Sequence, residues 1–124
     1  MSFISMIQTF INNDDLSIDH YDTNDHTIIV VDVPGVKIED INIKATPYFE
    51  LIIKTKRNLE IKERLYAYVQ NLQYGEKVRT INLGKNVDLQ KIETQLENGV
   101  LTIKIAKRIL GQEIDIPVGP VRSN

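Results

Sequence analysis

An Asn-Gly pair near the end of the chain constrains the fold more than any other feature. Asn98 and Gly99 lie between two stretches in which apolar and polar residues alternate. A two-residue type I′ turn needs positive φ at both central positions, and Asn-Gly adopts these values readily. After the turn, Leu101 and Ile103 share one face while Thr102 lies on the other. The sequence therefore predicts a β-hairpin whose second strand is half-buried.

A short apolar segment follows the hairpin after a glycine that frees the backbone. Its residues Ile114 and Ile116 are two positions apart, and the following Pro117 cannot donate a hydrogen bond within a central strand. We expect this tail to add to the edge of a sheet, on its own domain or on another copy. Val118 repeats the same spacing, so the registers Ile114 with Ile116 and Ile116 with Val118 both remain open.

The middle of the chain has the pattern of a β-sandwich. Short stretches with strand composition are separated by Pro-Gly, Thr-Pro, Tyr-Gly and Asn-Gly breaks, which predicts antiparallel sheets. The absence of Cys and Trp gives no support to an antibody-type sandwich. We divide the chain into an arm (1–15), a β-rich body (16–107) and an extension (108–124). The predicted strands are 16–21, 27–33, 41–45, 50–55, 66–69, 76–83, 92–97 and 100–106.

Composition narrows the functional classes. A chain of 124 residues fits one domain, and the absence of cysteine removes disulfides, thiolate metal sites and cysteine nucleophiles. A formal net charge of −2 argues against a nucleic-acid partner. No apolar run reaches the roughly 18 residues of a membrane span. The N-terminus also lacks the pattern of a secretory signal, so we expect cytoplasmic residence.

The arm has an amphipathic pattern. Phe3, Met6, Ile7, Phe10 and Ile11 recur at helical spacing over about three turns, which is marginal for an isolated helix. The segment is either an ordinary packed terminal helix or an exposed arm that binds clients or assembles subunits. Attachment to a membrane surface is disfavoured, because the arm carries no basic residue to meet anionic lipid.

Five segments in one order and spacing resemble the small heat shock proteins, the α-crystallin/Hsp20 family. Residues 94–101 are similar to the family's Ala-x-x-x-Asn-Gly-Val-Leu signature, and 114–116 to its Ile-x-Ile/Val tail motif. Residues 18–25 resemble its acidic entry strand, 33–41 its Leu-Pro-Gly-Val-x-x-Glu-Asp-Ile turn, and 74–79 its Tyr-Gly-x-Phe-x-Arg strand. Three positions depart from the family pattern: Thr94 replaces Ala, Lys77 replaces Phe and Gly84 replaces Pro.

The resemblance implies a fold and a function. The fold would be an immunoglobulin-like antiparallel β-sandwich, the α-crystallin domain, with a short arm and a C-terminal extension. The function would be that of an ATP-independent holdase, which binds unfolding client proteins as a dimer-based oligomer. Consistently, the sequence contains neither a Gly-x-x-x-x-Gly-Lys-Ser/Thr phosphate loop nor a Gly-x-Gly-x-x-Gly, and we expect no cofactor. The alternative is a co-chaperone-like sandwich that acts as an adaptor for one specific partner.

The resemblance also implies interaction sites. The tail-accepting groove would lie between Ile43 and Ala45 on one strand and Ile92 and Thr94 on another, and the tail of a neighbouring dimer would insert there. Full burial of two Ile side chains contributes about 3–6 kcal/mol before ordering costs. Such a link is weak singly and gains strength from many copies. In the arm, the client-binding residues would be Phe3, Ile7 and Phe10.

A long connection would form the dimer interface. Residues 56–75 exceed the usual loop length and contain an apolar and aromatic run. In bacterial and plant family members this loop donates a strand to the partner, which would place Tyr66 and Tyr68 at the interface. A local excursion on its own sandwich is the other interpretation. Arg79 shares a strand face with Ile81, so it must be paired, and we interpret it as an architectural ion-pair or dimer residue.

We find no catalytic constellation in the sequence. His20, Asp22, Asp25 and His26 cluster within seven residues and could in principle hold a metal or act as an acid–base pair. Their spacing matches no metal motif, and the segment is rich in turn residues. We therefore interpret them as solvated turn residues and expect a protein without enzymatic activity or metal.

Overall fold

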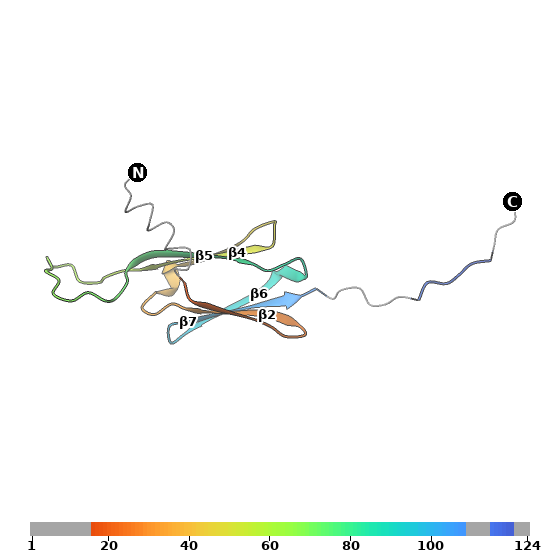
Figure 1. Cartoon of the computed structure of the whole chain (residues 1–124), viewed down its shortest axis with the longest axis horizontal. Coiled ribbons are helices and arrows are strands. Elements are labelled where there is room, and N and C mark those ends of the chain that lie inside the picture. Colours follow the sequence, from red (N-terminus) through yellow and green to blue (C-terminus); the bar gives the residue numbers. More distant parts are fainter. Residues whose placement is uncertain (1–15, 109–114, 121–124) are drawn as a thin grey trace.

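The fold is an antiparallel β-sandwich, as the sequence predicts (Figure 1). The computed structural model describes residues 16–108 and 115–120. Apolar side chains alternate with polar ones along most of the strands in this part of the chain, which suits a sheet with one buried face. The elements are β1 (Ile18–Asp22), β2 (His26–Asp32), the short 3-10 helix η2 (Ile38–Asp40), β3 (Ile41–Ala45), β4 (Glu50–Arg57), β5 (Gly75–Asn82), β6 (Val87–Glu97) and β7 (Val100–Lys107).

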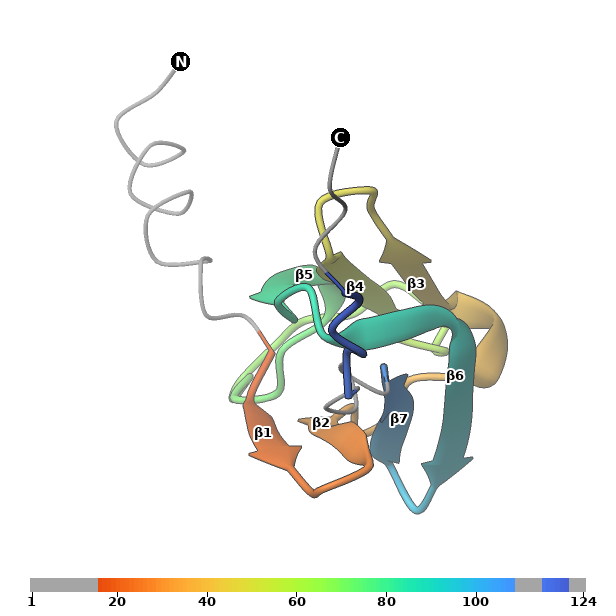
Figure 2. The same cartoon turned by 90° about the vertical axis from the view of Figure 1, so that its right-hand side faces the viewer.

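Two sheets form the layers of the sandwich. One sheet has the strand order β1-β2-β7-β6 and the other has the order β3-β4-β5, so each layer ends in two edge strands. All pairings between neighbouring strands are antiparallel. Figure 2 looks along the sandwich and separates the two layers, with the helix η2 on the connection between them. Edge strands are surfaces that can accept further strands.

The core lies between the two layers. Ile29 and Val31 of β2 and Ile103 of β7 face Leu51 and Ile53 of β4, and all five side chains are fully buried. Burial of each such side chain contributes roughly 1.5–3 kcal/mol. The four Ile and Val side chains are branched at Cβ, which also favours the extended backbone. The alternating pattern that identifies these strands in the sequence is therefore the same pattern that holds the sheets together.

The Asn-Gly hairpin is confirmed. Asn98 and Gly99 have φ values of 51° and 74°, as a type I′ turn requires. The turn is also tied to the end of β2, because the amide of Val33 donates a hydrogen bond of 2.8 Å to the carbonyl of Gly99. A Cβ atom at Gly99 would lie 3.4 Å from Cα of Pro34. That distance is an ordinary van der Waals contact, so the positive φ is what favours glycine at this position.

The prediction of a strand at 66–69 is wrong for the single chain. Residues 58–74 form an irregular loop between β4 and β5. The reason is that β4 and β5 pair with each other up to Arg57 and Gly75. The residues between these two positions therefore lie outside the sheet. The strand predicted at 92–97 is longer than expected, because β6 begins at Val87 and has an irregular register before Ile92.

Parts of the predicted arm and tail lie outside the described residues. These are the arm residues Phe3, Ile7 and Phe10 and the tail residue Ile114. The described part of the extension, 115–120, contains neither helix nor strand and leads away from the sandwich (Figure 1).

The hairpin geometry generates a test. Gly99→Ala forces a residue with a side chain into the left-handed region, so the free energy of unfolding should fall by about 1–2 kcal/mol. Gly119→Ala is the matched control, because no heavy atom lies within 4 Å of the added Cβ. Urea unfolding of both variants measures the difference. Equal stabilities for Gly99→Ala and the wild type would contradict the turn assignment.

Candidate functional site

The sandwich has two open sides, each framed by one edge strand from either sheet. Figure 2 shows β3 and β6 along one side and β5 and β1 along the other. Within the described residues, each of these strands is hydrogen-bonded to a neighbouring strand on one flank only. The free flanks can accept an added strand. The two sides differ in chemistry, which is the basis for assigning them different roles.

The side between β3 and β6 presents apolar inner faces. Ile43 pairs with the core residue Ile53, and Ile92 pairs with the core residue Ile105, so both face the interior. Ile43 and Ile92 are half-buried and pack against the core. Thr94 pairs with a core isoleucine in the same way, which places it on the same face.

Ala45 completes the set of predicted groove residues. It pairs with the core residue Leu51, so it also lies on the inner face of its strand. Both Ala45 and Thr94 are exposed to solvent. The structure therefore puts all four predicted residues on the inner faces of the two edge strands. Sequence analysis missed Ile41 and Leu96, which extend the same faces and are half-buried. Their alternation with Ile43 and Ile92 is the signal that could have identified them.

The described part of the tail is extended and free of the sandwich. Ile116 is 84% exposed and Val118 is 97% exposed. Pro117 lies between them and supplies no backbone donor. Large aliphatic side chains on an extended segment are well suited to add to a sheet edge, because alternate residues point into one face.

The side between β5 and β1 is polar. Arg79 and Lys77 lie on the inner face of β5, and Arg79 donates a hydrogen bond of 3.3 Å from Nη1 to the carbonyl of Leu16. His20 and Asp22 lie on the inner face of β1, opposite core positions of β2. The arginine therefore links the three-stranded sheet to the residue that precedes β1.

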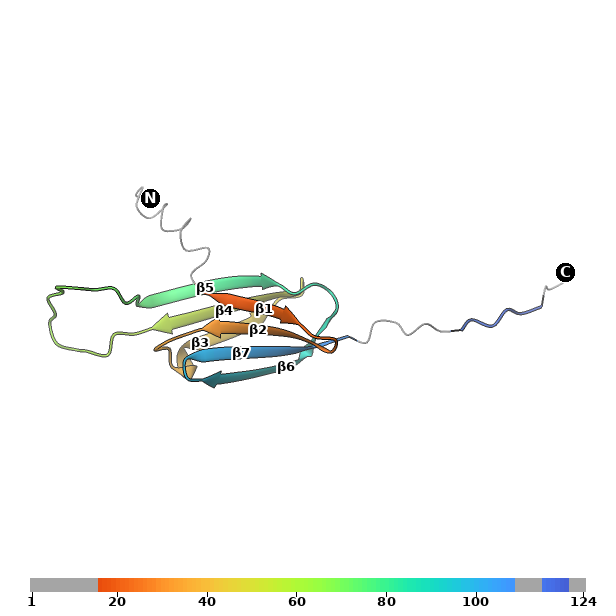
Figure 3. The same ribbon diagram turned by 60° about the horizontal axis from the view of Figure 1, so that its bottom comes forward.

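The loop 58–74 projects beyond the end of β4 and the start of β5 (Figure 3). It exposes a dense group of apolar side chains. Tyr66 is 74% exposed and Tyr68 is 98% exposed. The guanidinium of Arg64 lies 5.6 Å from the ring centroid of Tyr66. Apolar residues at this density on one loop are a typical feature of an interaction surface. The exposed members are Leu59, Ile61, Leu65, Tyr66, Tyr68, Val69 and Leu72.

Two polar contacts fix the first part of the loop. The amine of Lys37 lies 2.9 Å from a carboxylate oxygen of Glu60, and the side-chain amide of Asn58 donates a hydrogen bond of 3.3 Å to Asp40. The hydrogen bond to Glu60 raises the pKa of Lys37. These contacts anchor the loop to the segment around η2, while the aromatic run lies farther along the chain.

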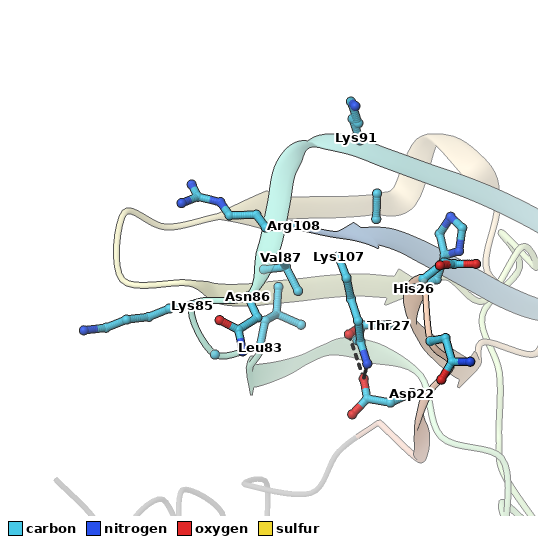
Figure 4. Close-up of a pocket in the computed structure, with 14 residues that line it drawn as sticks. Asp22, His26, Thr27, Leu83, Lys85, Asn86, Val87, Lys91, Lys107 and Arg108 are labelled. Carbon is cyan, nitrogen blue, oxygen red and sulfur yellow. Dashed lines mark hydrogen bonds and ion pairs between the residues drawn. The ribbon is translucent and has the colours of Figure 1, made fainter. Parts of the chain in front are cut away.

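A cleft of about 810 Å³ lies at the end of the sandwich where β7 ends (Figure 4). Lys107 points toward Asp22, with 3.6 Å between Nζ and Oδ1, and its amine donates a hydrogen bond of 2.7 Å to the carbonyl of Thr23. Lys85 and Lys91 also line the cleft but point away from Asp22. The cleft is open and charged, and its central contacts hold the β1–β2 turn to the end of β7.

A hydrogen bond controls the acidity of Asp22. The hydroxyl of the buried residue Thr27 donates a hydrogen bond of 2.8 Å to Oδ1, and this bond is the main reason that the pKa of Asp22 is lowered. The charge of Lys107 acts in the same direction. Asp22 therefore has a structural role at this turn.

The predicted histidine and aspartate cluster does not form a metal site in the described part of the chain. There, no three His, Cys, Asp or Glu side chains come together in a way that could hold a metal ion. His26 and Asp25 instead belong to the β1–β2 turn, where Thr23 Oγ1 accepts hydrogen bonds from both of their amides. Among residues 16–108 and 115–120 there is also no helix with the length and apolar character needed to cross a membrane.

The contact between Asp22 and Thr27 predicts a pH dependence. A carboxylate whose pKa is lowered on folding stabilises the fold above the unfolded pKa of 3.8, and this contribution is lost as the pH falls through the folded pKa. Asp22→Asn should therefore be less stable than the wild type at neutral pH, with the difference shrinking below pH 3.8. Thr27→Val should reproduce much of the effect. Urea unfolding across this range measures it, and parallel pH profiles for wild type and Asp22→Asn would contradict it.

Comparison with known proteins places this sandwich in a family. The sequence matches the Hsp20/alpha crystallin family over residues 19–119. A 22.7 kDa class IV heat shock protein of Pisum sativum is 34% identical over 91 residues, a match that covers 73% of this chain and 46% of that protein. A 22.0 kDa heat shock protein of Arabidopsis thaliana is 33% identical over 92 residues, covering 73% and 47%. The chain thus spans about half the length of these plant relatives.

Solved structures give the same result. A small heat-shock protein from Xylella fastidiosa superposes with a TM-score of 0.73 at 25% identity, covering 85% of this chain and 96% of that one. Heat shock protein 16.0 from Schizosaccharomyces pombe gives 0.69 at 25% identity, covering 84% and 97%. The chain therefore belongs to the Hsp20/alpha crystallin family, and its sandwich is an α-crystallin domain.

Proposed function

We propose that this protein is an ATP-independent holdase, which binds unfolding client proteins and prevents their aggregation. The observation that carries the proposal is an α-crystallin domain with unpaired edges and with apolar groups exposed on its loop and tail. Such groups can associate reversibly with each other and with the apolar surface of an unfolding client. The driving force is burial of apolar area, so the activity needs no nucleotide. We assign the chain no catalytic role.

In this proposal the tail links subunits through the side between β3 and β6. The tail of a neighbouring dimer adds between the two edges, with its aliphatic side chains against Ile43, Ala45, Ile92 and Thr94. The support is the inner-face position of these residues, together with an exposed, extended tail. Burial of two aliphatic side chains gives each link about 3–6 kcal/mol before ordering costs. Many weak links make an oligomer that exchanges subunits.

The loop 58–74 is the proposed dimer contact. Its run around Tyr66 and Tyr68 would pair with the free edge of a partner's β1, which restores the strand that the single chain lacks. The exposure of the loop and the unpaired flank of β1 support this arrangement. Arg79, at the same polar side, would keep the edge in place through its bond to Leu16. The arm residues Phe3, Ile7 and Phe10 would bind clients.

The cytoplasm is the proposed location. A chain without cysteine is suited to a reducing compartment, and its small negative charge gives no basis for a nucleic-acid partner. The proposed partners are unfolding proteins and other copies of this chain.

Heat-induced aggregation of a model client tests the proposal. With this protein present at near-stoichiometric subunit ratios and no ATP, light scattering of the client should be suppressed. The control is an equal mass of an unrelated small β-sandwich protein. Unchanged scattering, under conditions where this protein remains folded, would refute the holdase role and favour an adaptor with one dedicated partner.

A tail variant tests the assembly. The double change Ile114→Gly and Ile116→Gly removes both side chains from the link, so the mass of the oligomer measured by light scattering should fall toward that of a dimer. Val121→Gly lies outside both registers and should leave the mass unchanged. Comparison of Ile114→Gly with Val118→Gly identifies the register that is used. An unchanged mass for the double variant would contradict tail docking.

A further inference from the structure

A second cleft lies at the opposite end of the sandwich, where the loop 58–74 leaves the sheets. Its volume is about 220 Å³, and it opens between the end of β2, the end of β4 and the start of β5. Its lining combines aliphatic side chains with polar ones, among them the cations Arg57 and Lys77 and the buried Thr55. The apolar lining comes from Leu16, Val33, Pro34, Val36 and Leu72.

We propose that this cleft holds the ring of Phe10 from the arm of the same chain. The inference rests on the proposed function, in which Phe10 belongs to the client-binding arm. A docked ring would be withheld from clients, so the cleft would set how much of the arm is exposed. The tail side between β3 and β6 does not use this cleft, and the loop shares with it only the wall at Leu72 and its two neighbours.

The size and lining of the cleft suit one aromatic ring. An engineered protein cavity of about 150 Å³ lined by aliphatic side chains binds benzene. A cleft of 220 Å³ therefore has room for a phenyl ring without displacement of the core. The guanidinium of Arg57, which already lies 5.2 Å from the ring centroid of Tyr74, shows that cations in this lining can stack on aromatic faces.

The connection of the arm to the cleft supports the same occupant. Leu16 is buried in the wall of the cleft and is the first described residue, so the segment 1–15 ends at the site itself. Five residues, 11–15, separate Phe10 from Leu16, so the Cα atoms of the two are at most about 20 Å apart. The last four of these residues are Asn-Asn-Asp-Asp, which favour a turn that brings the ring back. Phe3 is more than twice as far along the chain, so Phe10 is the favoured ring.

Charge complementarity gives an independent argument. Asp14 and Asp15 directly precede Leu16, and residues 1–36 contain acids but no Lys or Arg. The cleft presents the opposite charge, because Arg57 and Lys77 line it and no acidic residue does. An arm that is apolar at Phe10 and acidic at its base therefore matches a cleft whose lining is partly aliphatic and carries two cations.

The cleft also couples the arm to the loop. Leu72 and its neighbours Asn71 and Gln73 form one wall, and they belong to the loop 58–74. A loop that pairs with a partner subunit would hold this wall in a defined position. Dimer formation and docking of the arm would then favour each other.

Tryptophan fluorescence tests the proposal, because the chain contains no tryptophan of its own. Phe10→Trp in the full chain should show emission at shorter wavelength and severalfold slower acrylamide quenching than the matched variant Phe3→Trp. Adding Leu72→Asp, which places a charge in the wall of the cleft, should return Phe10→Trp to the values of an exposed indole. Leu59→Asp is the control, because Leu59 is an exposed leucine of the same loop that does not line the cleft.

The outcomes separate this inference from the holdase proposal. An exposed indole in Phe10→Trp would overturn the docking of Phe10. So would a buried indole whose emission and quenching do not change when Leu72→Asp is added. When Phe10→Trp/Leu72→Asp is mixed with excess wild-type chain, its indole should stay exposed, and a return of the short-wavelength emission would overturn docking within one chain, because it would show that the cleft of a partner holds the ring. The fluorescence measurement uses no client protein. Docking of Phe10 can therefore be shown or refuted even if the protein does not suppress client aggregation.

Discussion

The fold depends on the burial of aliphatic side chains between two sheets of unequal width. Ile29, Ile103 and Ile53 illustrate the arrangement, since all three are fully buried and come from three strands of the two layers. A sandwich made from one four-stranded and one three-stranded sheet buries these residues but leaves four edge strands. The stability of the domain and its capacity to associate therefore arise from the same construction, because the sheets close on the core and remain open at their sides.

The two open sides differ because different side chains occupy the inner positions of their edge strands. Ile43 and Ile92 give one side an aliphatic surface, and Arg79 and Asp22 give the other a polar one. An apolar side favours reversible addition of an aliphatic tail. A polar side favours contacts with fixed direction, since hydrogen bonds and ion pairs depend on geometry. In the assembly that we propose, the sandwich is the stable part, and the loop, the tail and the arm are the associating parts.

Sequence reasoning succeeded where local signals and burial agree. The turn at Asn98 and Gly99 was predictable because positive φ at both positions has a distinct residue preference. Ile43 and Ile92 were named through the resemblance to the family, and the strand register places both on the inner faces of their strands. The strand at 66–69 failed because its composition suits a strand, yet the pairing of Arg57 with Gly75 leaves it no partner in its own chain. Composition can indicate that a segment is able to form a strand, but an edge must be available for pairing.

The sequence by itself determined the strands of the sandwich, the hairpin, the alternating core and the exclusion of cysteine chemistry, because each depends on neighbours along the chain. Only the tertiary structure decided which edges face each other. Residues as distant as Ile43 and Ile92 border one open side, and Leu16, Val36 and Leu72 line one cleft. The proximity of such distant residues depends on how the two twisted sheets stack and on where the connecting loops leave the strands. No local sequence pattern contains that information.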